Sequence, residues 1–262
     1  MLTPEQQQFI EAELPPRGGG TRLREIGGIP VLIKQLEPAR RHGLAPLANA
    51  LAAILGLPML RSVPVPGAME AQVIETHRLE TLKAAGASVP NVLHAAPRWL
   101  ALSFPGENSL DHMLRTHPEI AQRYWESGLD AILVLHRLGQ NASLCLARNM
   151  IWHDGKVSFI NFEDDPAASM PLSSAQARDW MLYLHSTAGI LNMAPEHIAA
   201  VFLRHLHKDQ PAVRHEVLRA ARTFGWLRIL PATKKTGVVT MQATASVLHQ
   251  VAVLARRERA IF

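Results

Sequence analysis

The spacing of hydrophobic residues along the chain changes near residue 105. Before that point, short apolar runs alternate with polar residues and are separated by Gly and Pro. After it, apolar residues recur every three or four positions. Alternation is typical of half-buried strands, and the longer spacing is typical of amphipathic helices. The sequence therefore predicts an α+β fold, with short strands in the first part and helices in the second.

Four short strands are expected in the first part. Residues 21–26 alternate in polarity, Gly27-Gly28 indicates a turn, and 31–36 form the next strand. Residues 99–104 predict a clearer strand that ends at Pro105-Gly106, and a shorter one is expected at 91–94.

Helices are predicted by caps and by apolar spacing. The first begins with Thr3 as its N-cap and Pro4 in its first turn. Others are expected at about 45–56, 69–86, 119–138 and 237–258, with three or four helices in all after residue 174.

One hairpin is expected within the helical part. Asp154-Gly155 lies between the apolar runs 149–152 and 157–160, and Asp-Gly favours a two-residue turn between paired strands.

Composition excludes several classes of protein. The chain has 262 residues, of which 48% are hydrophobic and 19% charged, so a fibrous or disordered protein is excluded. The single cysteine, Cys145, excludes an intramolecular disulfide and a cysteine-based zinc site. The net charge of +5 suits phosphates or an anionic lipid surface as partners. Basic residues are scattered and aromatic residues make up only 5%, so we do not expect nucleic-acid binding.

We expect no membrane span and no signal peptide. The N-terminus has neither a basic segment nor an apolar one. The uncharged runs 44–60 and 236–255 are interrupted by Pro, Asn, Gln and His. We therefore expect a cytoplasmic location, either free or at the inner face of a membrane.

Residues with candidate chemistry occur in a definite order. Gly18, Gly19 and Gly20 precede the first strand pair, and Lys34 lies on its second strand. Glu75 lies on the 69–86 helix, and the loop after the 119–138 helix leads to Asn149. The hairpin then ends in Phe159-Ile-Asn-Phe-Glu163.

This order resembles the protein-kinase-like superfamily over about residues 18–190, and most closely the bacterial lipopolysaccharide (Kdo/heptose) kinases and aminoglycoside-phosphotransferase-like proteins. The resemblance implies a bilobal fold. A small antiparallel-sheet lobe would cover 1–103 and a helical large lobe 104–262. It also implies that Gly18, Gly19, Gly20 and Lys34 bind ATP and that Glu75 pairs with Lys34.

The catalytic motifs depart from those of the family. The family loop His-x-Asp-x-x-x-x-Asn aligns with residues 142–149 without a gap. Ala142 then occupies the histidine position, Leu144 the catalytic aspartate position and Asn149 the metal-binding asparagine position. Leucine cannot accept a proton from a hydroxyl nucleophile.

The metal-binding motif also differs from that of the family. Asn161-Phe162-Glu163 stands where the family has Asp-Phe-Gly, and an amide oxygen is a weaker ligand for Mg²⁺ or Mn²⁺ than a carboxylate. A metal would depend on Asn149, Asn161 and the nearby Glu163, Asp164 and Asp165. These three acidic residues also fit a solvated loop, and Asn149 also fits a turn cap.

Two structural roles follow from the same comparison. The resemblance implies that Asp179 supports the catalytic loop. His136 lies on an apolar helix face and is expected to be a hydrogen-bonded core histidine.

Two functions remain open. The first is a pseudokinase that binds nucleotide weakly or not at all and acts through a protein partner. The alternative is a divergent ATP-dependent phosphotransferase acting on a sugar or lipopolysaccharide core. Residues 40–67 look like an insertion, either packed against the small lobe or presenting a surface to a partner or membrane.

Overall fold

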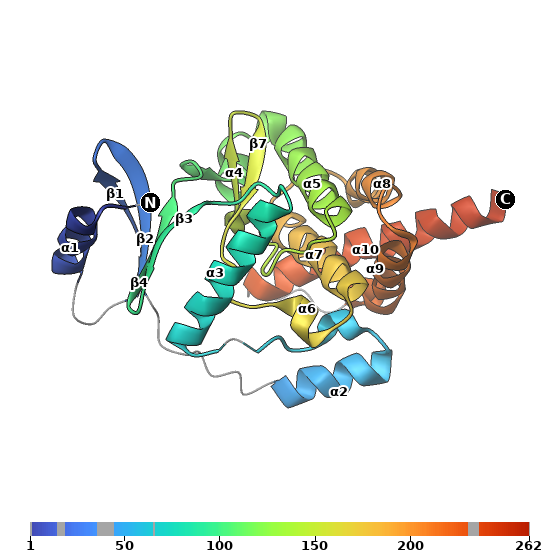
Figure 1. The fold of residues 1–262 in the computed structure, drawn as a ribbon. Helices are drawn as coiled ribbons and strands as arrows, with labels where there is room; N and C mark the ends of the chain where they lie inside the picture. The colour runs from blue at the N-terminus through green and yellow to red at the C-terminus, as the bar shows by residue number, and fades with distance from the viewer. Residues whose placement is uncertain (1, 15–18, 36–44, 65, 230–235, 262) are drawn as a thin grey trace.

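The fold is α+β, as predicted, with a small antiparallel sheet and many helices (Figure 1). The computed structural model describes residues 2–14, 19–35, 45–64, 66–229 and 236–261. Gly18 and the first part of the 40–67 segment lie outside the described residues.

A four-stranded antiparallel sheet has the order β1-β2-β4-β3. The strands are β1 (Gly20–Ile26), β2 (Ile29–Gln35), β3 (Val92–Ala96) and β4 (Trp99–Ser103). Gly27 and Gly28 join β1 to β2 with φ of 59° and 76°, values that favour glycine in a tight hairpin turn. All four strands were predicted, to within two residues at most ends.

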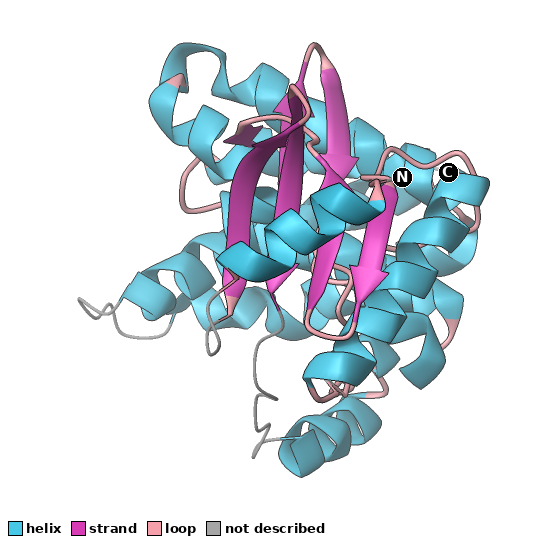
Figure 2. Cartoon of the chain, turned by 60° about the vertical axis from the view of Figure 1, so that its left-hand side comes forward, coloured by secondary structure: helices cyan, strands magenta, loops and turns pink. Residues whose placement is uncertain are grey.

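Helices cover both faces of this sheet (Figure 2). On one face, Ile10 of α1 (Pro4–Glu13) packs with Val31, Ile33 and Trp99. The opposite face packs against α3 (Ala68–Ala84). Because side chains alternate along a strand, Lys34 shares this second face with Leu32. The alternation of β2 therefore points Lys34 toward α3.

The N-terminus of α1 is capped as the sequence predicts. The Thr3 hydroxyl accepts a hydrogen bond from the Gln6 amide, and the Gln6 side chain accepts one from the Thr3 amide, which makes a capping box.

The predicted short apolar helix is α2 (Ala45–Leu55), followed by the single turn η1 (Pro58–Leu60). It lies at the lower edge of the molecule in Figure 1. Asn49 accepts a hydrogen bond from the Ser62 amide at 2.9 Å, and Leu57 and Met59 enter the core. The residues after the helix thus fasten it to the rest of the protein.

A second, three-stranded sheet has the order β5-β6-β7. It comprises β5 (Asn108–Ser109), β6 (Met150–His153) and β7 (Lys156–Phe159). Asp154 and Gly155 form the turn of the β6–β7 hairpin with positive φ angles, so the Asp-Gly prediction is confirmed. The elements between β5 and β6 are α4 (Leu110–Thr116), η2 (Pro118–Ile120), α5 (Ala121–Arg137) and η3 (Ala147–Asn149).

Helices make up the remainder of the chain. They are α6 (Pro166–Ser169), α7 (Leu172–Thr187), α8 (Pro195–Leu206), α9 (Pro211–Phe224), η4 (Gly225–Ile229) and α10 (Thr236–Ile261). Within the described residues, one helical stretch, Gly237–Glu258, is long and apolar enough to cross a membrane by length and composition. Its Leu248, Val251 and Ala255 are buried in the core.

The main core is continuous. It runs from Leu79 and Leu82 of α3 through α5 and α7 to α8, α9 and α10. Trp125 and Tyr183 lie at its centre, where the Tyr183 hydroxyl donates to the Trp125 carbonyl at 3.0 Å. Gly128 on α5 lets α7 approach closely, because a Cβ at this position would overlap the Tyr183 hydroxyl.

We expect Gly128→Ala to lower the free energy of unfolding by about 1–3 kcal/mol, since overpacking outweighs the gain in helix propensity. Urea unfolding measures this change. Gly237→Ala on α10 is the matched control, because a Cβ there meets nothing within 4 Å, and it should be neutral or stabilising. A stabilised Gly128→Ala variant would contradict the packing.

Candidate functional site

Lys34 is the centre of the candidate site. It is the last but one residue of β2, and it lies opposite Thr21 on β1 and Leu100 on β4. Its ammonium nitrogen (Nζ) lies 2.7 Å from Oε2 of Glu75. The ion pair that the sequence predicts, across 41 positions of the chain, is therefore formed.

Glu75 connects three segments of the chain. It is buried on α3, one turn before Leu79. While Oε2 accepts from Lys34, Oε1 accepts from the Phe162 amide at 3.3 Å. One carboxylate thus ties β2, α3 and the segment after β7 together.

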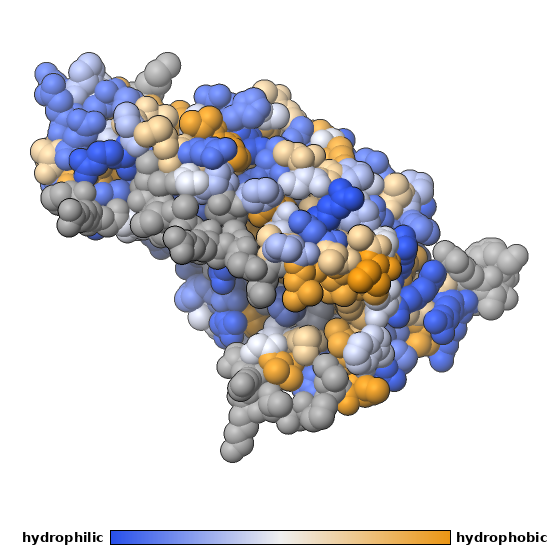
Figure 3. Space-filling view, turned by 90° about the horizontal axis from the view of Figure 1, so that it is seen from below, coloured by the Kyte–Doolittle hydropathy of each residue, from blue (hydrophilic) through white to orange (hydrophobic). Residues whose placement is uncertain are grey.

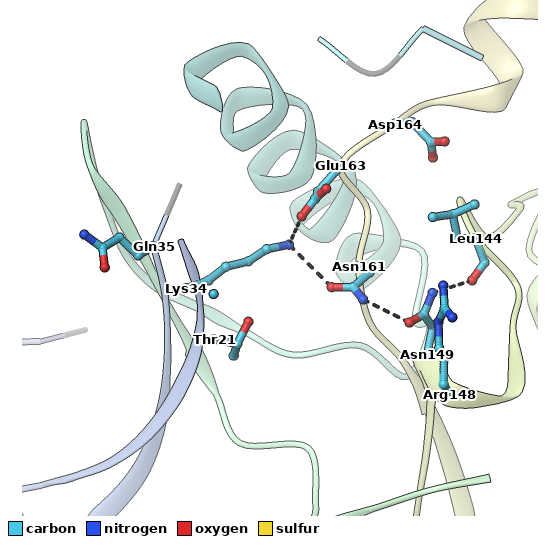
Figure 4. Close-up of a pocket in the computed structure, with 10 residues that line it drawn as sticks. Thr21, Lys34, Gln35, Leu144, Arg148, Asn149, Asn161, Glu163 and Asp164 are labelled. Atoms are coloured by element: carbon cyan, nitrogen blue, oxygen red, sulfur yellow. Dashed lines mark hydrogen bonds and ion pairs between the residues drawn. The ribbon is translucent and has the colours of Figure 1, made fainter. Parts of the chain in front are cut away.

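The Lys34 ammonium has two further partners. Glu163 Oε1 lies 2.7 Å from Nζ, and Asn161 Oδ1 lies 3.4 Å from it (Figure 4). An ammonium has three donors, so Glu75, Glu163 and Asn161 occupy all of them. Burial alone lowers the pKa of Lys34, but the charges of Glu75 and Glu163 outweigh it, and the pKa is raised above its ordinary value.

A chain of amides continues from Asn161. Its Nδ2 donates to Oδ1 of Asn149 at 2.9 Å, and Asn149 Nδ2 donates to the Leu144 carbonyl at 2.9 Å (Figure 4). Asn161 has a φ of 65°, in the left-handed region that asparagine tolerates better than most residues. The two amide oxygens expected to bind metal are both used within the protein.

The loop between α5 and β6 is held from behind by Asp179 of α7. The Ala142 amide donates to Asp179 Oδ2 at 2.7 Å, which is the supporting contact predicted for this aspartate. Ala142 itself is buried, whereas Leu144 is half-exposed. The loop therefore keeps its backbone support but presents an aliphatic side chain.

His136 completes a buried network with two aspartates. Its Nε2 lies 3.3 Å from Asp179 Oδ2 and its Nδ1 2.7 Å from Asp209 Oδ2, which also accepts from the Trp180 indole at 2.6 Å. The prediction of a hydrogen-bonded core histidine is confirmed. Burial alone lowers the pKa of His136, but the two aspartates outweigh it and raise the pKa. For Asp179, burial dominates and raises the pKa of the carboxyl.

A cavity of about 280 Å³ opens beside Lys34. Among its lining residues are Gly20, Lys34, Leu144, Arg148 and Asp164. Thr21, Gln35, Asn149, Asn161 and Glu163 complete the lining. Two basic and two acidic side chains thus face the cavity, which lacks the positive excess expected around a polyphosphate.

Two of the residues that the resemblance assigns to the ATP site, Glu75 and Gly19, do not line the cavity. Glu75 is buried and reaches the site only through its ion pair with Lys34. Of the glycine triplet, Gly20 lines the cavity with a φ of 114°, Gly19 does not, and Gly18 lies outside the described residues.

The acidic residues after Asn161 are engaged separately. Glu163 binds Lys34, and Asp165 caps α6 by accepting from the Ala167 amide at 3.2 Å. Asp164 is buried with one oxygen, Oδ1, lacking a hydrogen-bond partner, and burial raises the pKa of its carboxyl. No group of three His, Cys, Asp or Glu within the described ranges could hold a metal ion. The three acidic residues therefore do not converge on one metal position.

The sequence analysis did not single out Arg78, which supports the loop after α5, or Arg148, which lines the cavity. Arg78 lies one turn after Glu75, and its guanidinium donates to the Asn141 carbonyl at 2.6 Å. The spacing of three from Glu75 is the pattern that could have found it. Arg148 lines the cavity and directly precedes Asn149.

Comparison with protein-family models finds no match, and comparison with curated proteins finds no significantly similar sequence.

We expect Lys34→Met to lower the free energy of unfolding by about 3 kcal/mol, because it leaves the buried Glu75 carboxylate without its cation. In Lys34→Met/Glu75→Gln the uncompensated charge is gone, and much of the loss should be recovered. Urea unfolding compares the two.

Glu163→Gln is the matched control, since its side chain is 44% exposed and the pair it makes should contribute less than about 1 kcal/mol. Equal stability of Lys34→Met and the wild type would contradict the structural role of the ion pair.

The His136 network predicts a pH dependence. A histidine whose pKa is raised in the folded state stabilises the protein below its unfolded pKa of about 6.5 and loses this contribution as the pH rises through the folded pKa. We therefore expect the wild-type free energy of unfolding to fall as the pH rises above about 6.5. His136→Gln should lack this fall, as measured by urea unfolding at several pH values. A wild type and a variant with parallel pH profiles would rule the effect out.

Proposed function

We propose that this chain is a kinase-like pseudoenzyme that does not transfer phosphoryl groups and acts through contacts with a partner. The observation that carries this proposal is the state of Lys34, whose three donors are all occupied by side chains of the protein itself. In a working phosphotransferase such a lysine binds phosphate oxygens.

Two contacts support a kinase-like ancestry. Lys34 on β2 pairs with Glu75 on the α3 helix, and Asp179 holds the backbone of the loop that leads to Asn149. We propose on this basis a bilobal arrangement with a small lobe over 1–103 and a large lobe over 104–262.

Loss of phosphoryl transfer is supported by three further features. Leu144 faces the cavity where a group able to orient a hydroxyl nucleophile is needed. Asn149 and Asn161 hydrogen-bond each other, so their oxygens are not turned toward a common metal. Glu163 neutralises Lys34 from the solvent side. Leu144 thus removes the group that would orient the nucleophile, while the two asparagines and Glu163 weaken metal and polyphosphate binding.

ATP titration calorimetry with the purified chain, with and without Mg²⁺ or Mn²⁺, tests the proposal. We expect weak binding or none, no gain from metal and no turnover. Turnover that disappears in Lys34→Ala would overturn it.

Glu163 supplies a sharper prediction. Glu163→Gln removes the negative charge from the solvent side of Lys34, so ATP affinity should rise by about fivefold, equivalent to about 1 kcal/mol. Glu80→Gln is the matched control, because Glu80 is an exposed glutamate on α3. Unchanged affinity in Glu163→Gln would show that Glu163 does not compete with the nucleotide for Lys34.

A second candidate function is a divergent ATP-dependent phosphotransferase for a sugar or lipopolysaccharide core. The unpartnered Oδ1 of Asp164 favours it, since a carboxylate that lines the cavity could serve as a metal ligand. On this alternative, Asn161→Asp keeps or raises phosphotransfer, while Asp164→Ala/Asp165→Ala abolishes it. If neither change alters activity, the alternative fails.

A further inference from the structure

Helix α2 carries an exposed aliphatic surface. Leu47, Leu51 and Ile54 follow each other at spacings of four and three, which places them on one side of the helix. Leu47 is 67% and Ile54 81% exposed, and Ala52 is the only residue of α2 that is fully buried. Figure 3 views the molecule from the side on which α2 lies and shows hydrophobic side chains gathered there. We call Leu47, Leu51 and Ile54 the α2 patch.

The sequence on either side of α2 contains no acidic residue. There is no Asp or Glu between Glu37 and Glu70, while Arg40, Arg41 and Arg61 lie within that stretch. Helix α2 itself has no charged residue at all.

A basic row on α9 adjoins the C-terminal end of α2. His215, Arg219 and Arg222 are exposed and lie at spacings of four and three, on one side of α9. The Arg219 guanidinium donates to the Leu55 carbonyl at 3.1 Å and packs against Gly56, whose φ is 60°. We call His215, Arg219 and Arg222 the α9 row. The contact of Arg219 with Leu55 brings this arginine of the α9 row to the C-terminal end of α2, one residue after Ile54.

We propose that the α2 patch and the α9 row together bind the surface of an anionic lipid membrane. An 11-residue helix is too short to span a bilayer but long enough to lie in the interface with its aliphatic side in the acyl region. Basic side chains beside it then meet anionic headgroups.

The chemistry of the α2 patch favours lipid over a protein partner. Energetic centres of protein interfaces are rich in Trp, Tyr and Arg, and Leu is under-represented there. The α2 patch has two leucines and one isoleucine, without aromatic or hydrogen-bonding groups. Aliphatic side chains of this kind partition into lipid without needing a matched pocket.

Flotation with lipid vesicles tests the proposal on the full chain. We expect the wild type to bind vesicles of phosphatidylcholine mixed with phosphatidylglycerol, and to bind phosphatidylcholine alone much more weakly. Raising the salt from about 0.1 M to about 0.5 M should release the protein, because headgroup charges are then screened.

Matched variants separate the aliphatic and the basic contributions. Leu47→Ser/Ile54→Ser should lower vesicle partitioning at least about tenfold, since two aliphatic side chains no longer enter the lipid. Ile29→Ser/Val134→Ser removes two exposed aliphatic residues from the β1–β2 hairpin and α5, and should leave partitioning unchanged.

Arg219→Gln/Arg222→Gln should lower partitioning on the order of fivefold for each arginine, and only on anionic vesicles. Arg123→Gln/Arg137→Gln, two exposed arginines of α5, should have no effect. Thermal unfolding of each variant verifies that it is folded.

Three outcomes would overturn the proposal. One is a wild type that fails to float with anionic vesicles, and another is equal partitioning of Leu47→Ser/Ile54→Ser. The third is concentration-dependent dimerisation in light scattering, abolished by Leu47→Ser/Ile54→Ser without any vesicle binding, which would assign the surface to a second copy of the chain.

Discussion

The ion pair between Lys34 and Glu75 is the contact on which the site depends. Glu75 is buried, and a buried carboxylate is costly unless a cation and hydrogen-bond donors surround it. Lys34 and the Phe162 amide supply these donors from two other segments. The need to satisfy one carboxylate therefore holds the sheet, α3 and the segment after β7 in a single arrangement.

The Lys34 ammonium has a second carboxylate partner besides Glu75. Glu163 stands at the solvent side of Lys34, so the ammonium is neutralised from both sides. Beyond it, Asn161 Nδ2 donates to Asn149 Oδ1, and Asn149 Nδ2 donates to the Leu144 carbonyl. Polar groups that already bond one another add rigidity, and a ligand must break these bonds before it can form new ones. Lys34 therefore mainly connects β2 with α3 and with the segment after β7.

The loop between α5 and β6 is also supported from behind the site. Asp179 holds the Ala142 amide and His136 at once, and Asp209 accepts from the other side of the imidazole and from Trp180. The polar groups of the loop are thus positioned although Leu144 offers no chemistry to a substrate. The exposed residues of the α2 patch and of the α9 row are not members of this network.

Local pattern in the sequence determined most of the fold and part of the site. Alternating strands, the Asp154-Gly155 turn and the Thr3 cap are set by interactions within a few residues, so they can be predicted from the sequence. The Lys34–Glu75 pair was implied by the resemblance to the kinase-like superfamily, and the structure forms it. Only the tertiary structure decided that Glu163 turns to Lys34, that Asn161 bonds Asn149, and that Arg78 reaches Asn141. These contacts join residues from 12 to 129 positions apart, counting 163 − 34 = 129 for the longest, and no local pattern encodes which polar partner a side chain finds. The same reason explains α2: its apolar character is visible in the sequence, but whether that surface is covered depends on how distant helices pack.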